Sequence, residues 1–414
     1  MTLYTRVAIL CFFLLSFTKS FSQQLPKLKI NLDQAYGGAF SDYLDSIEYI
    51  PLETTEGSLF GDISELIITD SSFVVTDIDT RSILFFSLSG KFIKRISKRG
   101  TLLVTVAVHD VHKNKIAIVF QNASRTKKEI GIFSLLGDFI KTSTLKDNEA
   151  DFYRNSIIID ENNYWLKNPL LEFDPVSNFH FLQYRNNVKV KSVIPMDSLN
   201  RYSLHRLIKR ISPQNRPMVY SNNFYFSTPL EHKVYKVSTL TGEAEPLFQL
   251  VFPASLGINN KLLAISEKKQ IDSIVNTKWF TETTVLSLEN IFCDDNKIMF
   301  KTRTGSFGFY GPDGKVVARN FLYKFQDGRL IAFERVRPDS STYFLPFSDA
   351  SLISFEGFHY SKECMYTYIS SLQMFSAYQA TKEKNPQYPP VLQSYFKTQN
   401  RKSNPVIVRM KLKE

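Results

Sequence analysis

This sequence has little of what small disulfide-rich domains and membrane proteins depend on. It contains three cysteines and two tryptophans in 414 residues. Cys11 lies near the N-terminus, and Cys293 and Cys364 alone are too few for a disulfide-stapled scaffold. One bridge between the last two fits the count, but two buried thiols are the simpler expectation. Beyond the first residues no stretch is apolar for long enough to span a bilayer, so we predict no membrane-spanning helix.

The sequence also lacks the short motifs of common enzymes. It has no G-x-S-x-G nucleophile elbow. The stretch GSFGFYGPDG, 305–314, has no Lys-Ser/Thr pair and leads into a strand, whereas a phosphate loop needs a helix N-terminus. His109 and His112 are spaced so that a strand points them to opposite sides, and zinc would need further ligands. We therefore predict no metal and no cofactor, and an enzyme is the less favoured class.

The first residues have the form of a secretory signal peptide. Arg6 gives a short basic region, residues 7–17 an apolar run, and Ser20-Phe21-Ser22 a small-x-small cleavage site. The run is too short for a transmembrane helix. Cys11 lies inside the apolar run, whereas the cysteine of a lipoprotein follows that run and a small residue. We therefore interpret Cys11 as an ordinary residue of the signal peptide.

Cleavage of the signal peptide, residues 1–22, should leave one domain of residues 23–414 in an exported compartment: the periplasm, the cell surface or the medium. The cut removes Arg6 and Lys19, so the formal net charge falls from +11 to +9. N-terminal sequencing or the intact mass of the exported protein checks this prediction. A mature chain that keeps residues 1–22, or a lipid on Cys11, would contradict it.

A unit of two apolar strands joined by a tight turn recurs along the chain. SILFFSLSGKFIKRI, 82–96, is nearly repeated as EIGIFSLLGDFIKTS, 129–143, and three further copies follow. Successive turns lie 47, 50, 55 and 72 residues apart. This spacing indicates propeller blades, each a four-stranded antiparallel sheet of roughly 40 to 50 residues, whereas a β-sandwich predicts no such period. The turns fall at Gly90, Gly137, Asn186-Asn187, Gly242 and Asp313-Gly314.

Closure of the ring predicts a sixth blade, because an open ring would expose raw sheet edges. DSIEYIPLE, 45–53, and NPVIVRMKLK, 404–413, are lone strands at the two ends of the chain. We expect them to pair in one blade, completed by GRLIAFERV, 328–336, and STYFLPFS, 341–348. The predicted fold class is all-β: a six-bladed β-propeller of four-stranded antiparallel blades, closed by pairing of its N- and C-terminal strands.

Two stretches depart from the strand pattern. Residues 266–280 lengthen the last interval between turns and predict a short amphipathic helix. In 361–384 the apolar residues recur with helical spacing, which predicts a second helix ended by Asn385-Pro386. We place a small helical insertion at about 361–400, in blade six, where insertions often carry function. The residues with this spacing are Met365, Tyr368, Ile369, Leu372 and Phe375.

Several segments resemble a known family. IEYIPLETTEGSLFGDISELIITDSSFVVTDIDTRSILFFSLSGKFIKRI resembles the opening of the exported six-bladed β-propeller proteins of Bacteroidetes, relatives of NHL-repeat propellers. FYFSTPLEHKVYKVSTLTG is similar to their fourth blade and NPVIVRMKLK to their closing strand. The opening IPLETT and the ending are moderately specific. The Gly-Pro-rich turn that many relatives have after the first blade is missing, since the chain at that point reads SKRGTLLVTVAV. The resemblance implies a fold and an exported location, but no established activity.

The candidate binding residues lie in RYSLHRLIKRISPQNRP, 201–217. Its apolar residues, Leu204, Leu207, Ile208 and Ile211, keep helical spacing. This spacing leaves Arg206, Lys209 and Arg210 largely outward, where they would make an anion-contacting edge. A solvated connector explains the same pattern more simply.

Asp77 and Asp79, at the end of a strand, are the candidates for a cation. Calcium-dependent six-bladed lactonases bind their metal with carboxylates that converge from several blades, and oxygen ligands suit calcium. An aspartate at a strand end is ordinarily a turn former.

The favoured function is therefore an exported, non-catalytic binding propeller that recognises a glycan, peptide or protein partner on one face. Tyrosines could supply surfaces on which sugars stack. The alternative is a metal-dependent, calcium-type lactonase-like hydrolase or lyase with a site in the central channel. A sensory or scaffold partner in nutrient uptake is a third class. Export argues against nucleic acid as a ligand, even though the chain is basic.

Overall fold

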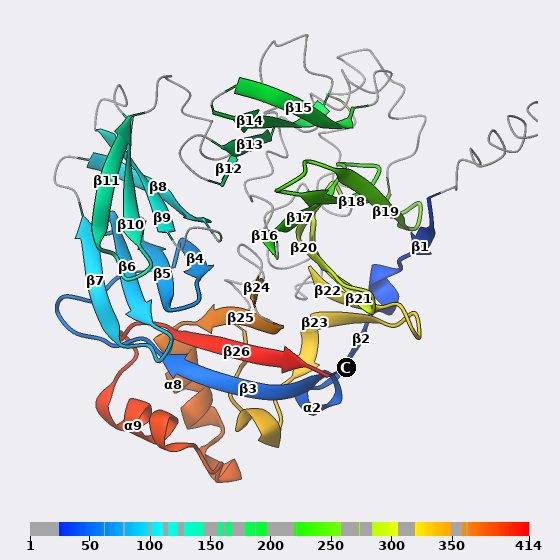
Figure 1. Cartoon of the computed structure of the whole chain (residues 1–414). Helices are drawn as coiled ribbons and strands as arrows, with labels where there is room; N and C mark the ends of the chain where they lie inside the picture. The colour runs from blue at the N-terminus through cyan, green and yellow to red at the C-terminus, as the bar shows by residue number, and fades with distance from the viewer. Residues whose placement is uncertain are drawn as a thin grey trace, which may run out of the picture.

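The described residues form six sheets around a common axis, and all strand pairs are antiparallel except one in each of two sheets (Figure 1). The computed structural model describes residues 25–61, 63–77, 79–97, 101–110, 115–122, 128–144, 156–159, 163–167, 179–186, 188–196, 219–220, 222–257, 273, 284–304, 319–348, 358–361 and 363–413. Apart from three strands of the N-terminal segment, which are added at the outside of three sheets, strand order within each sheet follows the chain, as the blades of a propeller require. The predicted six-bladed β-propeller is therefore confirmed.

The strands of each blade run in order from the axis of the ring to its outside. Blade one is β4 (Glu65–Ile68), β5 (Ser72–Asp77), β6 (Ser82–Ser87) and β7 (Phe92–Ser97). Blade two is β8 (Thr101–Asp110), β9 (Lys115–Asn122), β10 (Lys128–Ser134) and β11 (Phe139–Thr144). Blade three is β12 (Ser156–Ile158), β13 (Tyr164–Lys167), β14 (Phe179–Arg185) and β15 (Val188–Pro195).

The other three blades complete the ring. Blade four is β16 (Val219–Tyr220), β17 (Asn223–Ser227), β18 (Lys233–Ser238) and β19 (Ala244–Val251). Blade five is β20 (Ser287–Cys293), β21 (Lys297–Arg303), β22 (Asn320–Lys324) and β23 (Leu330–Arg337). Blade six is β24 (His359–Ser361), β25 (Cys364–Ile369), β26 (Val406–Leu412) and β3 (Leu44–Pro51).

The repeated glycine marks the turn between the third and fourth strands of a blade. Gly90 and Gly137 have φ values of +82° and +84°, which residues with a side chain rarely adopt. Each turn also touches the preceding blade: a Cβ on Gly90 would lie 2.2 Å from the carbonyl oxygen of Pro51, and one on Gly137 would lie 2.9 Å from the Phe85 ring. The repeated glycine therefore lies in a turn and also in a contact between neighbouring blades.

In blade five this turn lies at Gly328 (φ +68°), between β22 and β23. The prediction that it lies at Asp313-Gly314 was wrong, since residues 305–318 precede β22 and lie outside the described residues. Both stretches have an Asp-Gly pair between apolar residues, so the local pattern could not separate them.

Blade six confirms the predicted closure and corrects its composition. β26 pairs with β3 from Val406↔Pro51 to Leu412↔Leu44. However, 328–336 belongs to β23 of blade five, and 341–348 forms no strand. A 3-10 helix, η2 (Ser340–Thr342), begins there, and Tyr343 and Phe344 then adopt positive φ of 56° and 57°, which ends any extended conformation. The strand β25 comes from residues predicted to be helical, and β24 lies at the start of that segment and just before it.

The helical insertion begins later than predicted. Residues 364–369 form β25, which is buried along its whole length, so its apolar spacing carries no helical signal. The helix α8 (Ser371–Ala380) starts at Ser370, whose hydroxyl accepts the Gln373 amide hydrogen. A short η3 (Lys382–Lys384) ends at Asn385 as predicted, and α9 (Pro390–Thr398) follows. The helix predicted at 266–280 lies outside the described residues, apart from Ser273, which is helical.

The N-terminal segment runs along the outside of three blades before closing the ring (Figure 1). β1 (Lys27–Lys29) pairs in parallel with β19 as a fifth strand of blade four. After η1 (Leu32–Gln34), β2 (Tyr36–Ala39) pairs in parallel with β23 of blade five. A short helix, α2 (Phe40–Tyr43), then leads into β3. The sequence pattern had assigned no element to residues 23–44.

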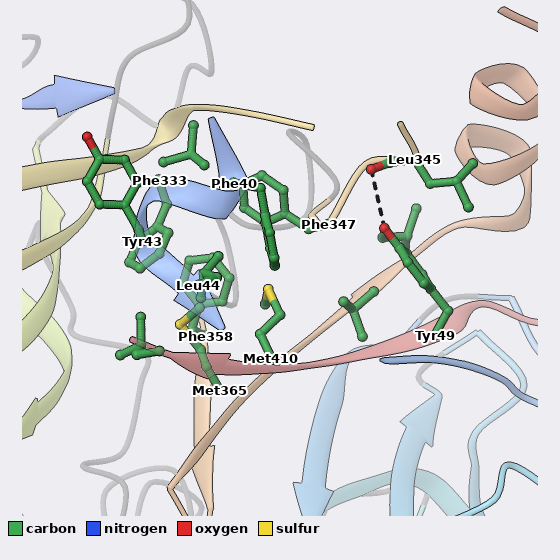
Figure 2. Close-up of a cluster of buried hydrophobic side chains, with 14 of the residues drawn as sticks. Phe40, Tyr43, Leu44, Tyr49, Phe333, Leu345, Phe347, Phe358, Met365 and Met410 are labelled. Atoms are coloured by element: carbon green, nitrogen blue, oxygen red, sulfur yellow. Dashed lines mark hydrogen bonds between the residues drawn. The ribbon is translucent and has the colours of Figure 1, made fainter. Parts of the chain in front are cut away.

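Blades five and six share a large apolar core (Figure 2). Phe333, Met365 and Met410 come from three strands and are no more than 1 % exposed. The helices join this core through Met374 and Leu392, which are fully buried. Tyr49 lies with its hydroxyl 3.1 Å from the Pro346 carbonyl and 3.3 Å from that of Leu345. The insertion is thus packed onto blade six.

Cys293 and Cys364 are free and buried, which confirms the expectation of two buried thiols. Burial raises the pKa of the Cys293 thiol to about 12, so it stays protonated at neutral pH. Within the described part of the chain, no helix is long and apolar enough to cross a membrane.

Candidate binding site at one face of the propeller

The two faces of the ring differ in the lengths of their connections. Since neighbouring strands are antiparallel, the first-to-second and third-to-fourth connections of each blade lie at one face. The second-to-third connections and those between blades lie at the other face. The first face has tight hairpins, such as 88–91 and 135–138, and the other has segments such as 338–358 and 370–405. We call the latter the long-connection face.

Buried and partly buried polar and charged residues lie near strand ends on the long-connection face. Glu289 is the third residue of β20, and Lys301 and Arg303 are near the end of β21. Lys167 ends β13, and His359 begins β24. Arg319 directly precedes β22, and Glu334 lies in the middle of β23. We define the basic cluster as Lys167, Glu289, Lys301, Arg303, Arg319, Glu334 and His359.

Glu289 holds two cations of blade five. Arg303 Nη1 lies 2.8 Å from Glu289 Oε1, and Lys301 Nζ lies 3.9 Å from Glu289 Oε2. The side chains of Glu289 and Lys301 are each 5 % exposed. The register explains the contact, because Glu289 pairs with Lys301 and Ser287 with Arg303, which places all four on one side of the sheet.

A second carboxylate lies on the opposite side of blade five. Glu334 Oε1 accepts hydrogen bonds from the amides of Arg319 and Asn320 at 3.0 Å and from Asn320 Nδ2 at 2.8 Å. Desolvation raises the pKa of Glu334, and these donors oppose that effect. The pKa of Arg319 is lowered, first by burial, while Glu334 raises it and Arg303 lowers it. Arg303 and Arg319 are therefore close enough to repel each other.

Lys167 brings a charge from blade three toward the same place. Its Nζ lies 5.7 Å from the centre of the Phe226 ring in blade four. Burial lowers the pKa of Lys167 to about 8, while Glu289 raises it and Arg303 lowers it. The charges of Glu289 and Arg303 therefore act on Lys167, whose printed contact is with blade four.

The histidines at this face are neutral at physiological pH. Burial, with the charge of Lys167, lowers the pKa of His180 to about 3. Burial, with the charge of Lys301, lowers the pKa of His359 to about 4. Neutral imidazoles donate and accept hydrogen bonds without adding charge. Among the residues that the structure describes, the basic cluster thus contains four cations and two carboxylates.

The structure describes some of the residues that were predicted to be functional and not others. Arg206, Lys209 and Arg210 lie outside the described residues, in the connection between β15 and β16. The side chains of His109 and His112 lie outside them too.

The carboxylate of Asp77 accepts hydrogen bonds from the amides of Gly61 (3.3 Å), Asp79 (3.1 Å) and Thr80 (3.3 Å). Asp77 is therefore a turn former in this structure. Among the described residues, no three His, Cys, Asp or Glu side chains gather as a metal site would require.

The basic cluster was missed by sequence reasoning, although a signal was present. SLENIFC, KIMFKTR and YWLK each place a charged residue inside an apolar strand. A charge in such a position is buried in a propeller, and buried charges are rare unless they are paired or functional. Their convergence from different blades requires the folded ring.

The architecture defines the class of protein: a closed six-bladed β-propeller with a basic cluster at the long-connection face. The chain belongs to a family described as a domain of unknown function, DUF4934, which matches residues 27–411. No protein with a curated description matches the chain in sequence.

Solved structures resemble it in fold. A protein described as a "Putative exported protein" from Bacteroides fragilis is 11 % identical, with a TM-score of 0.62, over 94 % of this chain and 100 % of that one. A protein of unknown function from Bacteroides caccae is 8 % identical (TM-score 0.36, covering 70 % and 91 %). A member of the DUF4221 family from Bacteroides vulgatus is 10 % identical (TM-score 0.39, covering 90 % and 98 %). At these identities the likeness concerns the fold alone.

Proposed function

We propose that this chain is an exported binding propeller that recognises a glycan, peptide or protein partner at the long-connection face. The observation that carries the proposal is the basic cluster, in which side chains from three blades converge at this face. Such a cluster is not needed to stabilise the fold. Burial of charged side chains costs free energy, whereas apolar side chains in the same places would avoid that cost. Strand ends that hold buried polar groups are typical of ligand sites.

Two further observations support the proposal. The Bacteroides fragilis protein that shares the fold is described as exported, and the first residues of this chain have the form of a signal peptide. The carboxylates of the basic cluster already contact Arg303, Lys301 and Asn320. That arrangement favours binding over the lactonase-like alternative, in which carboxylates must be available to coordinate a cation.

When arrays of immobilised glycans and peptides are probed with the purified mature chain, the chain should bind members of one chemical class. Hydrogen exchange of the complex then identifies the face that binds. We expect slower exchange in the connections 228–232, 284–286 and 338–348, because a ligand at the long-connection face covers them. The hairpins 88–91, 135–138 and 239–243, at the opposite face, serve as the internal control and should be unchanged.

Protection confined to the hairpins would show that the other face binds. Retention of nothing from either array, together with unchanged exchange in both sets of connections, would contradict a binding function for glycans and peptides.

A further inference from the structure

Three connections of blades four and five meet at the long-connection face. The Leu230 amide, between β17 and β18, donates to the Leu286 carbonyl, just before β20, at 3.0 Å. The Val285 amide donates to the Leu256 carbonyl, beyond β19, at 2.8 Å. Two backbone hydrogen bonds therefore link the three segments. We define the four–five contact as residues 228–232, 252–257 and 284–286.

The first of these segments is held in a strained conformation. Leu230 and His232 have φ values of 67° and 54°, which residues with a bulky side chain rarely adopt. The His232 amide donates to the Thr228 carbonyl at 2.9 Å, and the His232 carbonyl accepts from the Leu250 amide at 3.0 Å. Such strain persists only where surrounding contacts fix the backbone. Its release therefore favours an open form once those contacts are lost.

The side chain of His232 is enclosed in the four–five contact. It is 3 % exposed, and its ring meets the Phe252 ring at 89°, with 5.0 Å between the ring centres. Within the described part of the chain, neither Nδ1 nor Nε2 forms a hydrogen bond. A protonated imidazole donates from both nitrogens and so needs two acceptors. The site therefore accommodates the neutral ring more readily than the cation.

Charged groups near His232 are confined to its own connection. Glu231 and Lys233 flank it in sequence and pair with each other at 3.2 Å. The segments that pack against His232 are 250–257 and 284–288, which read LVFPASLG and TVLSL and contain no titratable residue. Among these described elements, no unpaired carboxylate is present to stabilise a proton on the ring.

The protonation of His232 is therefore coupled to opening. Burial lowers the pKa of His232 to about 4, from an ordinary value of 6.5, and the Val285 backbone opposes this effect only in part. In an open form the ring meets water, and its pKa returns toward the ordinary value. Below pH 6.5 the open form binds more protons than the closed form, so acid favours opening. From pH 7.5 to pH 5.0 the ratio of open to closed forms should rise about thirtyfold.

We propose that the four–five contact is an acid-sensitive switch at the long-connection face, which opens when His232 takes up a proton. The inference goes beyond the proposed function, and its test needs no ligand. Because the same segments belong to the face proposed to bind, opening would alter that face at acidic pH.

Hydrogen exchange of the mature chain at pH 7.5 and pH 5.0 tests the proposal, after correction for the intrinsic effect of pH on exchange. Protection in peptides that cover 228–232 and 284–286 should fall about thirtyfold at the lower pH. The strands β5 and β6 of blade one are buried and contain no histidine, so they serve as the internal control. An equal loss of protection in these strands would show general acid unfolding and would overturn a local switch.

Two variants assign the effect to His232. Asparagine adopts the left-handed conformation more readily than most residues and is neutral at both pH values. His232→Asn should therefore have the same protection at pH 5.0 as at pH 7.5. His232→Gln, which is closer in length, provides the same comparison if the first variant does not fold. His180→Gln removes another buried histidine, in β14, and should retain the full fall in protection.

The wild-type chain alone can overturn the switch, since unchanged protection of the four–five contact at pH 5.0 would contradict it without any variant. An equal fall in the His232 variants would show that another group responds to acid, which would overturn the assignment as well. Neither result bears on ligand binding, so the proposed function is tested separately.

Discussion

Deletion of residues 404–414 should abolish cooperative folding of the whole propeller. β26 lies between β25 and β3, so its loss leaves two unpaired edges and opens the ring. Val406, Ile407 and Val408 are fully buried and Met410 is 1 % exposed. Burial of each such side chain stabilises by about 1.5 to 3 kcal/mol, and a typical domain has only about 5 to 15 kcal/mol in total. Thermal unfolding followed by circular dichroism checks the result.

A point substitution tests the same closure in a chain of full length. Met410→Ala should reduce the free energy of unfolding by about 2 to 5 kcal/mol, because it opens a cavity between blades five and six. Lys411→Ala, at the next and exposed position of β26, is the matched control and should cost little. A melting transition that survives the deletion unchanged would mean that the ring closes elsewhere.

The period of the repeat was enough to predict the fold because each blade is a local unit. The outer two strands of blades one and two lie within a residue of the predicted segments 82–96 and 129–143. The two strands of a hairpin are close in the chain, so the local sequence contains both of them and their turn. Blade six was predicted only in part, because its strands come from both ends and are interrupted by α8 and α9. In β25 both faces are buried, so the period-two alternation that identifies a strand was absent.

The outer strands β1 and β2 were beyond prediction for a different reason. They pair in parallel with β19 and β23, which lie more than 200 residues away in the chain. Short strands at such distances have no partner that local sequence can reveal. The basic cluster shares this property: Lys167 and Arg303 are recognisable as charges in strands, but their proximity depends on how blades three to five curve around the axis.

The two most specific segments of the family resemblance meet in the structure. IPLETT follows β3, and Asn404 begins the segment that becomes β26. Asn404 is fully buried, and its backbone amide donates to Thr54 Oγ1 at 3.0 Å. Its carbonyl accepts from the Ser371 hydroxyl at 2.7 Å, which ties the start of α8 to the same point. Both segments therefore lie where the ring closes.

The side chain of Asn404 completes this junction with three hydrogen bonds. Its Nδ2 donates to the carbonyls of Glu53 (2.8 Å) and Ser58 (3.0 Å), and its Oδ1 accepts from the Phe60 amide at 3.3 Å. Asn404→Ala leaves these backbone groups without their partner in a buried place, and each such loss costs about 1 to 3 kcal/mol. Because the three bonds share one side chain, their losses do not simply add.

We therefore expect Asn404→Ala to lower the free energy of unfolding by about 3 kcal/mol or more, measured by urea denaturation. Asn296→Ala, in an exposed turn of blade five, is the matched control and should change the free energy by less than about 0.5 kcal/mol. Asn404→Asp keeps the acceptor that the Phe60 amide needs but places a buried carboxyl oxygen against the Glu53 and Ser58 carbonyls, so it should destabilise the fold as well. Equal stability of Asn404→Ala and the control would mean that strand pairing between β26 and β3 closes the ring without this junction.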